Sequence, residues 1–359
     1  MTLRATSPSS ARTSSRTSAP ARPAGADDLG RLRSVAFSAA YRMLGSVTEA
    51  EDVAQDAMLR VAPDGAVPPD VRNPEAFTTT VATRIALDLL RSARVRRESY
   101  VGEWLPEPLV SEAVATGTPP ADAAAHAELA DDLSTAFLVL LETLTPSERA
   151  AFLLHDVLGY PHREAARVIG TTELAARQLA SRARRRVAAR RQAGVAEASG
   201  APASRDPHAA ELVERFIAAT VEGDLDALLE LLADDVEFVG DGGGNVPPGM
   251  AVTRPVAGRE AVARLLVGFV RRGVPARLEP ATVNGLPGMV AYADDPTGGG
   301  LIGTFAIELS GGRVAALRGV VNPEKLRHLG PLADLDAMAT ALRRSAARRR
   351  SAERPGPEA

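Results

Sequence analysis

The residues with the clearest chemical potential form a basic segment, PHREAARVIGTTELAARQLASRARRRVAARR, at positions 161–191. It holds nine arginines against two glutamates, a net charge of +7. Arginine and glutamine side chains on a helix can reach base edges and phosphates in the major groove of DNA. The pattern therefore predicts a DNA-binding element, with a solvated basic helix that binds nothing as the alternative.

Two helices must position these side chains, in the arrangement of a helix-turn-helix. The first is predicted over residues 162–169, and Gly170 marks the tight turn after it. Thr171 or Thr172 can cap the second helix, whose amino-terminal end suits contact with phosphate. The apolar positions of the second helix fall at helical spacing, at Ala176, Leu179, Ala183 and Val187. The opposite surface carries the candidates for base edges, Arg177, Gln178 and Ser181, and for the DNA backbone, Arg182, Arg184 and Arg185.

The composition limits the classes of protein to which the chain can belong. With 359 residues, 45% of them apolar, it has room for about two or three domains with cores. The absence of cysteine excludes disulfides and thiolate metal sites, and the five histidines show no metal-ligand spacing. No apolar run is long enough to cross a membrane. We therefore expect a cytoplasmic protein without metal, cofactor or membrane partner. The net charge of -3 is compatible with DNA binding because the basic residues are clustered.

The first half of the chain has the periodicity of helices. A tail at residues 1–25 is predicted to be disordered, and apolar positions between 28 and 44 then form one stripe. The sequence Thr48-x-x-Glu51 is typical of a capping box that opens a second helix. The sequence Asn73-Pro74-Glu75 begins a third, which ends in a basic cluster near residue 97.

The rest of the chain divides into linkers, further helices and a domain of different texture. Prolines and small residues mark linkers at 98–125 and 193–205, and the first contains the only tryptophan, Trp104. Helices are expected between them, one of them at a second capping box, Thr145-Pro146-Ser147-Glu148. After residue 206, helices followed by strands predict an α+β domain with a curling antiparallel sheet, and an Arg/Ala-rich tail occupies 334–359.

Several of these segments resemble one family. Residues 48–60, TEAEDVAQDAMLR, and 77–97, FTTTVATRIALDLLRSARVRR, are similar to region 2 of the bacterial extracytoplasmic-function (ECF) sigma factors of the sigma-70 family, and residues 142–187 to their region 4. The strings YVGEWLPEP, DGGG (241–244) and NPEKL (322–326) together resemble the subgroup with a SnoaL-like C-terminal extension. Asn245 follows the glycines where that subgroup usually carries lysine.

The resemblance implies a multidomain fold and a set of partners. Two all-α sigma domains, a region 2 bundle at 26–97 and a region 4 helix-turn-helix at 126–192, precede an α+β SnoaL-like cone domain at 206–333. The implied partners are promoter DNA and core RNA polymerase, through its β′ clamp helices and β flap. A separate anti-sigma factor is then not needed, and the cone has room for an unidentified small ligand.

The resemblance also assigns residues to three further surfaces. Binding of core polymerase is expected at Glu49, Asp52, Gln55 and Asp56. Contact with the unpaired -10 strand is expected at Arg84, Asp88, Arg91, Arg94, Arg96 and Arg97. Asp88 either accepts a hydrogen bond in that contact or pairs with Arg84 or Arg91. Regulatory contacts between domains are expected at Trp104, Leu105, Pro106, Asp241, Gly242, Gly243, Gly244, Asn322 and Pro323.

The last domain leaves an enzymatic and a regulatory hypothesis. Relatives of the cone fold use an aspartate and a histidine in catalysis, but here Asp241 lies in a glycine-rich loop and His208 and His328 lie at the two ends of the domain. No catalytic residue is therefore predicted. The favoured hypothesis is a sigma factor that recognises -35 and -10 elements and is regulated in cis by its extension. The alternative is a one-component helix-turn-helix regulator with a ligand-binding or cyclase-like cone, which has no use for an acidic helix followed by a basic one.

Overall fold

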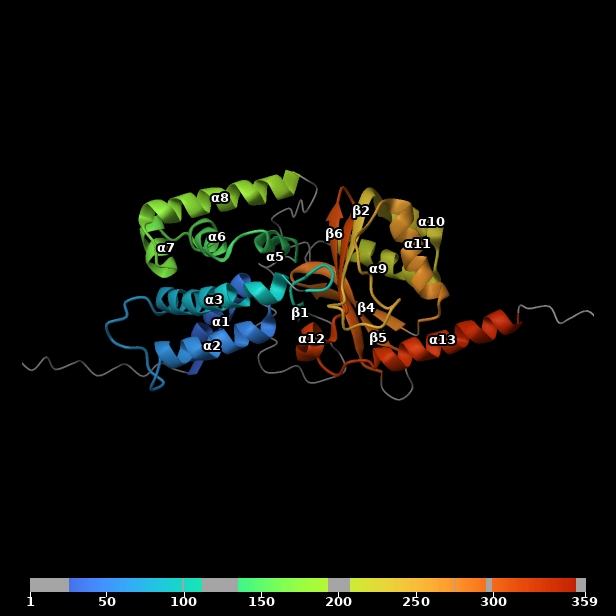
Figure 1. Ribbon diagram of the computed structural model, residues 1–359, viewed down its shortest axis with the longest axis horizontal. Helices are drawn as coiled ribbons and strands as arrows, with labels where there is room; N and C mark the ends of the chain where they lie inside the picture. The colour runs from blue at the N-terminus through green and yellow to red at the C-terminus, as the bar shows by residue number, and fades with distance from the viewer. Residues whose placement is uncertain are drawn as a thin grey trace, which may run out of the picture.

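The computed structural model describes residues 26–98, 100–111, 135–192, 207–274, 276–294 and 299–352. The amino-terminal half is helical, and the carboxyl-terminal half is a sheet with helices (Figure 1). This order confirms the predicted fold class of helical domains followed by an α+β domain. The predicted disordered tail at 1–25, the second linker at 193–205 and residues 112–134 lie outside the described residues.

Three helices form the first bundle: α1 (Ala26–Leu44), α2 (Val47–Val61) and α3 (Pro74–Glu98). The side chain that caps α2 is Ser46, whose hydroxyl accepts a hydrogen bond from the Glu49 amide at 3.2 Å. The capping box predicted at Thr48 is therefore wrong. The chain already turns at Gly45, where φ is +65°, so the helix begins before Thr48 is reached.

The second helical group contains the predicted helix-turn-helix. Its elements are α5 (Thr135–Glu142), α6 (Pro146–Phe152), the π-helical turn η1 (Leu153–Val157), α7 (His162–Ile169) and α8 (Glu173–Gln192). Both halves of the capping box between Thr145 and Glu148 are present, as predicted. Gly170 is left-handed at φ 76°, and the Thr172 hydroxyl accepts from the Ala175 amide at 3.2 Å. Glycine and a threonine cap thus set the angle between α7 and α8.

The two helical groups share one hydrophobic core. Leu87 and Leu90 of α3 belong to the same buried cluster as Leu141 and Phe152 of the second group. The close packing of α3 against α6 and α7 therefore excludes water from the seam between the groups.

A buried arginine adds polar contacts across the same seam. Arg149 of α6 is 3% exposed, and its Nη1 atom donates to the Met43 carbonyl of α1 at 2.8 Å. The same nitrogen lies 2.7 Å from the Glu142 carboxylate. This pairing neutralises a charge that would otherwise be costly to bury.

The carboxyl-terminal half is a mixed sheet with helices against one face (Figure 1). Its elements are α9 (Pro207–Glu222), α10 (Leu225–Leu231), β2 (Leu232–Asp241), β3 (Val256–Ala257), α11 (Arg259–Arg271), β4 (Ala276–Val283), β5 (Leu286–Ala293), β6 (Leu301–Ser310), β7 (Arg313–Val320), α12 (Pro323–Leu326), the 3₁₀ turn η3 (Arg327–Leu329) and α13 (Leu335–Ala352). The strand order is β1-β4-β5-β6-β7-β2-β3, in which β1 (Val110–Ser111) comes from the first linker. Neighbouring strands are antiparallel except β2 and β7, which are parallel.

The prediction of an antiparallel sheet is therefore wrong for one pair of strands, β2 and β7. One helix and four strands separate β2 from β7 along the chain, and this long crossover lets β2 join the sheet in the same direction as β7. The four later strands lie within a residue or two of their predicted positions. Part of the Arg/Ala-rich tail, over 335–352, is the helix α13.

The first linker crosses to the sheet and becomes part of it. Its residues Val110–Ser111 form β1, which pairs antiparallel with β4. Leu105 is buried with Val239, Val290 and Leu326 on the face of the sheet opposite α9–α11. The linker therefore lies between the sheet and the amino-terminal helices, where Figure 1 shows β1 and α12.

Asn284 joins this sheet to both helical groups. It is held at φ 47°, in the turn between β4 and β5. Its Oδ1 atom accepts from the Leu109 amide at 2.7 Å and lies 3.2 Å from the Tyr41 hydroxyl of α1. Its Nδ2 atom donates to the Thr135 hydroxyl of α5 at 3.2 Å. One buried amide thus contacts the linker and both groups of helices.

We expect Asn284→Ala to lower the free energy of unfolding by about 3 kcal/mol, because buried polar partners lose their bonds and alanine is strained at positive φ. Urea denaturation followed by circular dichroism measures the change. Asn245→Ala, at an exposed turn position, is the matched control and should cost under about 0.5 kcal/mol. Equal stability of the two variants would show that the Asn284 junction is not a structural link.

Candidate nucleic-acid interface and interdomain contacts

The predicted base-edge candidates lie together on the recognition helix α8. Around a shallow depression lie Leu174, Arg177, Gln178, Ser181, Arg182 and Arg185. Leu174 is 68% exposed and was not predicted as a candidate. An exposed apolar side chain beside arginine and glutamine suits contact with a thymine methyl group. Thr171 and Thr172 lie at the amino-terminal end of the same helix.

Two backbone candidates have partners within the second helical group. Arg184 donates to the Asp156 carboxylate at 2.7 Å, and Arg182 to Glu148 at 3.2 Å. Arg186 also donates to Glu148, at 2.6 Å. Burial raises the pKa of the Glu148 carboxyl, but hydrogen bonds from Thr145 and Arg182 and the charge of Arg186 more than offset this and leave the pKa below its ordinary value. An ionised Glu148 therefore orients two arginines of α8.

The -10 candidates on α3 face the second helical group. The Arg84 guanidinium donates to the Arg167 carbonyl of α7 at 2.8 Å. The guanidinium nitrogens of Arg91 lie 3.5 Å from the Asp88 carboxylate and 3.5 Å from the Ser147 hydroxyl of α6. Of the alternatives left open for Asp88, the structure shows the contact with Arg91. The side chains of Arg94, Arg96 and Arg97, in the last turns of α3, lie outside the described residues.

The acidic candidates on α2 form one exposed face. Asp52, Gln55 and Asp56 are exposed, whereas Glu49 is half-buried. Leu59, one turn further, is 62% exposed. An exposed leucine that continues an acidic stripe gives a partner both charge and an apolar contact on the same helix face.

A buried carboxylate holds the first linker against the sheet. Asp241, the last residue of β2, is completely buried. It accepts hydrogen bonds from the Tyr100 hydroxyl, from the Leu105 amide at 2.8 Å and from the Lys325 ammonium at 2.7 Å. Lys325 also donates to the Leu105 carbonyl. Lys325 is the only lysine in the chain, and both charges of this buried pair are satisfied by the linker and by each other.

Aromatic side chains and an amide complete this arrangement. The Lys325 ammonium lies 4.1 Å from the centre of the Trp104 ring and 4.8 Å from that of Tyr100, in the geometry of a cation–π contact. The Asn322 side chain donates to the Tyr100 oxygen at 2.9 Å. Burial raises the pKa of Tyr100, and its hydrogen bond to Asp241 raises it further, so the hydroxyl stays protonated as a donor. We call Tyr100, Trp104, Leu105, Asp241, Asn322 and Lys325 the latch.

Two glycine positions allow the latch to close. A Cβ atom at Gly243, where φ is +61°, would overlap the Asn322 side chain and the Tyr100 hydroxyl. A Cβ atom at Gly45, between α1 and α2, would lie 2.6 Å from the Trp104 ring. The backbone of the Gly-rich loop therefore approaches the linker closely, which a side chain at Gly243 would prevent.

Beyond the latch, the linker binds the start of α2. The Glu107 carboxylate accepts from the Ser46 hydroxyl at 2.8 Å and from the amides of Val47 at 2.7 Å and Thr48 at 3.2 Å. A carboxylate at this place satisfies free amides and complements the helix dipole. The linker therefore connects the sheet to the helix that carries the acidic face.

Sequence reasoning predicted Trp104, Leu105, Asp241 and Asn322 as interdomain residues but missed Lys325, Glu107 and Asn284. Glu107 lies in the motif YVGEWLPEP and Lys325 in the motif NPEKL. A charged residue inside each motif was therefore the signal that could have identified them as contact residues. Pro323 begins α12, and Asn322 caps it by accepting from the Glu324 amide at 3.1 Å. Pro106 is buried within the linker.

The geometry around Asp241 offers no place for acid–base catalysis, because both carboxylate oxygens are bound to the linker and Lys325. His328 lies with its Nε2 atom 2.8 Å from the Pro108 carbonyl, so it too contacts the linker. Within the described ranges, no three histidine, aspartate or glutamate side chains are grouped as metal ligands. Among the same residues, no helix is both long and apolar enough to span a membrane.

These features define a class: a DNA-binding protein whose two helical domains are joined through a latched linker to a cone-shaped domain. Residues 30–96 match the family Sigma-70 region 2, residues 134–187 match Sigma-70, region 4, and residues 213–317 match the SnoaL-like domain family.

The chain is 41% identical over 307 residues to the ECF RNA polymerase sigma factor SigJ of Mycobacterium tuberculosis, covering 82% of this chain and 90% of that protein. It is 32% identical over 302 residues to the probable ECF RNA polymerase sigma factor SigI of the same species, covering 80% and 89%. The crystal structure of SigJ aligns with a TM-score of 0.65 and 36% identity, covering 86% of this chain and 100% of that one. The chain belongs to the ECF RNA polymerase sigma factor family, in the subgroup with a SnoaL-like C-terminal extension.

We expect Asp241→Asn and Lys325→Met each to lower the free energy of unfolding by about 3 kcal/mol or more, because each leaves one buried charge unpaired. The double variant should cost about 2 kcal/mol less than the sum of the two, as measured in a double-mutant cycle by urea denaturation.

Arg264→Met is the control for this cycle, since the Arg264–Glu260 pair is exposed and its loss should change stability by under about 0.5 kcal/mol. Additive effects of Asp241→Asn and Lys325→Met would contradict the direct coupling described for the latch.

Proposed function

We propose that this sigma factor binds core RNA polymerase and the -35 and -10 promoter elements, and that its SnoaL-like domain regulates initiation in cis through the latched linker. The observation that carries this proposal is that a single linker segment, residues 100–109, is bound to the sheet by Asp241 and to α2 by Glu107. The predicted domain bounds, 26–97, 126–192 and 206–333, are part of the proposal.

The acidic face of α2 supports the assignment of a polymerase surface. Three exposed side chains lie on one side of the helix beside Leu59: Asp52, Gln55 and Asp56. Basic groups on the β′ clamp helices would complement this charge and steer association. The second helical group is assigned to the β flap and to the -35 element, with Leu174 and Gln178 on the DNA side of α8.

The arrangement of the two helical groups supports a closed, regulated state. Arg84, a candidate for the -10 strand, is bound to a carbonyl of the helix-turn-helix. The -10 and -35 elements lie apart along the DNA, so reading both requires α3 and α7 to separate. The SnoaL-like domain opposes this separation, because its Asn284 contacts α1, α5 and the linker at once. The extension therefore acts where an external inhibitor would act, and no separate anti-sigma factor is required.

Run-off transcription with purified core polymerase tests both parts of the proposal. A promoter library should give transcripts from a defined -35/-10 pair only when the full chain and core polymerase are both present. Lys325→Met should raise the yield at limiting core polymerase, since a weakened latch favours separation of the two helical groups. Asn245→Ala should transcribe like the wild type.

Two outcomes of this assay would count against the proposal. Failure of the full chain and of Lys325→Met to initiate would reject the polymerase-binding role. Equal yields from the wild type and Lys325→Met, with both active, would reject regulation through the latch.

Substitutions on α8 separate base reading from backbone contact. Gln178→Ala should reduce discrimination between the preferred and a mismatched -35 element by about 1–3 kcal/mol, whereas Arg185→Ala should weaken binding to all sequences and lower the salt slope by about 1. Holoenzyme binding to the two promoters over a range of salt concentrations measures both effects. Loss of discrimination in Arg185→Ala, with none in Gln178→Ala, would reverse the assigned roles.

A further inference from the structure

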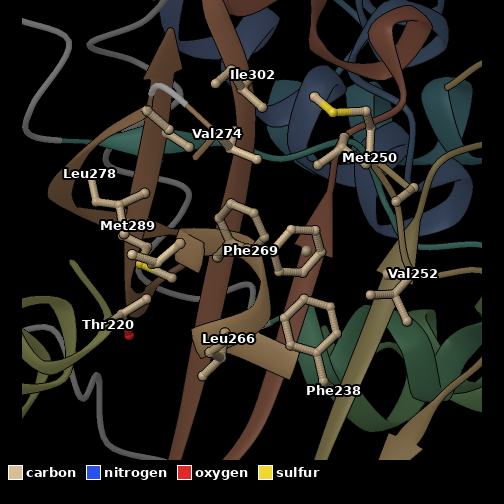
Figure 2. A pocket seen from close by; sticks show the side chains of 18 of the residues that line it. Thr220, Phe238, Met250, Val252, Leu266, Phe269, Val274, Leu278, Met289 and Ile302 are labelled. Atoms are coloured by element: carbon tan, nitrogen blue, oxygen red, sulfur yellow. The ribbon is translucent and has the colours of Figure 1, made fainter. Parts of the chain in front are cut away.

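The cone domain encloses an apolar cavity of about 230 Å³ between the sheet and its covering helices (Figure 2). Helices α9 and α11 contribute one side of the wall, and strands β2 and β4–β7 contribute the other. The labelled side chains in Figure 2 converge on the same space, among them Phe238, Met250, Leu266, Phe269 and Met289. Val221 is 51% exposed at the edge of the cavity, where α9 ends.

The chemistry of the wall defines the chemistry of a ligand. In the described part of the chain, the wall contains no charged side chain. Thr220 carries its only side-chain hydroxyl, and that group already donates to the Phe216 carbonyl at 2.8 Å. A charged or strongly polar molecule would therefore lose its hydration without compensation. An apolar cavity of roughly 150 Å³ stays dry and takes up benzene, so this larger one has room for a two-ring hydrocarbon body.

The cavity and the latch share their walls. In β2, Gly240 lines the cavity, and the next residue is Asp241 of the latch. After β7, Val321 lines the cavity, and the next residue is Asn322 of the latch. The two strands are tied at this place, since the Val321 amide donates to the Asp241 carbonyl at 2.9 Å. A shift of the wall therefore moves latch residues directly.

The loop between β2 and β3 makes a second connection. Val252 of this loop lines the cavity and packs on β2 so closely that a Cβ atom at Gly240 would lie 2.8 Å from its carbonyl oxygen. The same loop carries Gly243, which abuts Tyr100 and Asn322. A ligand that displaces Val252 therefore also shifts the loop that carries the glycine contact of the latch.

We propose that this cavity binds an uncharged small molecule with a hydrocarbon body of about two rings, and that its occupancy loosens the latch. The consequence of this loosening for transcription rests on the proposed function. Ligand binding and opening of the latch do not depend on it.

Binding is tested with prodan, an uncharged naphthalene dye, titrated into the full chain. We expect saturable, blue-shifted emission that decalin, a two-ring hydrocarbon, displaces. Ala276→Leu and Val270→Phe each fill the cavity from a different element and should weaken prodan binding by about tenfold or more. Ala261→Leu, on the exposed face of α11, should bind like the wild type. Circular dichroism verifies that each variant is folded.

Non-saturable emission, or folded cavity-filling variants that both bind prodan as tightly as the wild type, would overturn the assignment of a ligand site.

Latch opening has a direct chemical readout, because Lys325 is the only lysine and Trp104 the only tryptophan in the chain. With saturating decalin, acetylation of Lys325, followed by peptide mass spectrometry, should accelerate several-fold in the wild type, and the Trp104 emission should shift. Both changes should be absent in Val270→Phe.

Decalin that displaces prodan without changing either readout would overturn the coupling of cavity and latch. Since neither readout involves polymerase or DNA, failure of this inference and failure of the proposed function are distinguishable.

Discussion

The burial of the Asp241 carboxylate is the constraint on which the arrangement of domains depends. A charge without contact with water must find donors within the protein, and here the donors come from the linker and from Lys325 of α12. If Tyr100 or Leu105 moved away, the Asp241–Lys325 pair would be exposed to water or Asp241 would lose a hydrogen-bond donor. The position of the linker is therefore determined by electrostatics more than by its own secondary structure, which over residues 100–111 is limited to the two residues of β1.

Once the linker is held in this way, its next residues reach the amino-terminal helices. Glu107 satisfies amides at the start of α2, and the Tyr41 hydroxyl donates to the Glu107 carbonyl at 2.5 Å. Burial raises the pKa of Tyr41, with a further contribution from the Glu107 charge, so this donor stays protonated. The polar contacts therefore form a chain from β2 to α1 and α2, and each contact depends on the linker keeping its place. A displacement at the end of β2 is therefore transmitted through the linker to α2, the helix that carries the acidic face.

Local signals in the sequence predicted the helices, the turn at Gly170 and the later strands, because capping residues, glycine and periodicity act within a few positions. They failed where distant residues decide the structure. The start of α2 is bound by Glu107, about sixty positions away, as well as by its local cap Ser46, and the direction of β2 depends on pairing with β7 across the whole domain. The latch joins positions near 100, 241 and 325, which are far apart in the sequence. Asp241 and Asn322 were predicted as contacts between domains only because three separate motifs resemble the same subgroup. Lys325 was missed because its charge has meaning only beside the buried Asp241.

For a joint between domains that must open, a buried ion pair is better suited than an apolar contact of the same size. Its net stabilisation is small, because the desolvation of both charges offsets most of their attraction. When the joint opens, water solvates both charges and recovers much of that cost, so the open and closed states differ by little in free energy. An apolar joint would lose its full hydrophobic stabilisation on opening. The pairing of Asp241 with Lys325 therefore fixes the position of the linker, yet a small difference in binding free energy is enough to shift the equilibrium from the closed to the open state.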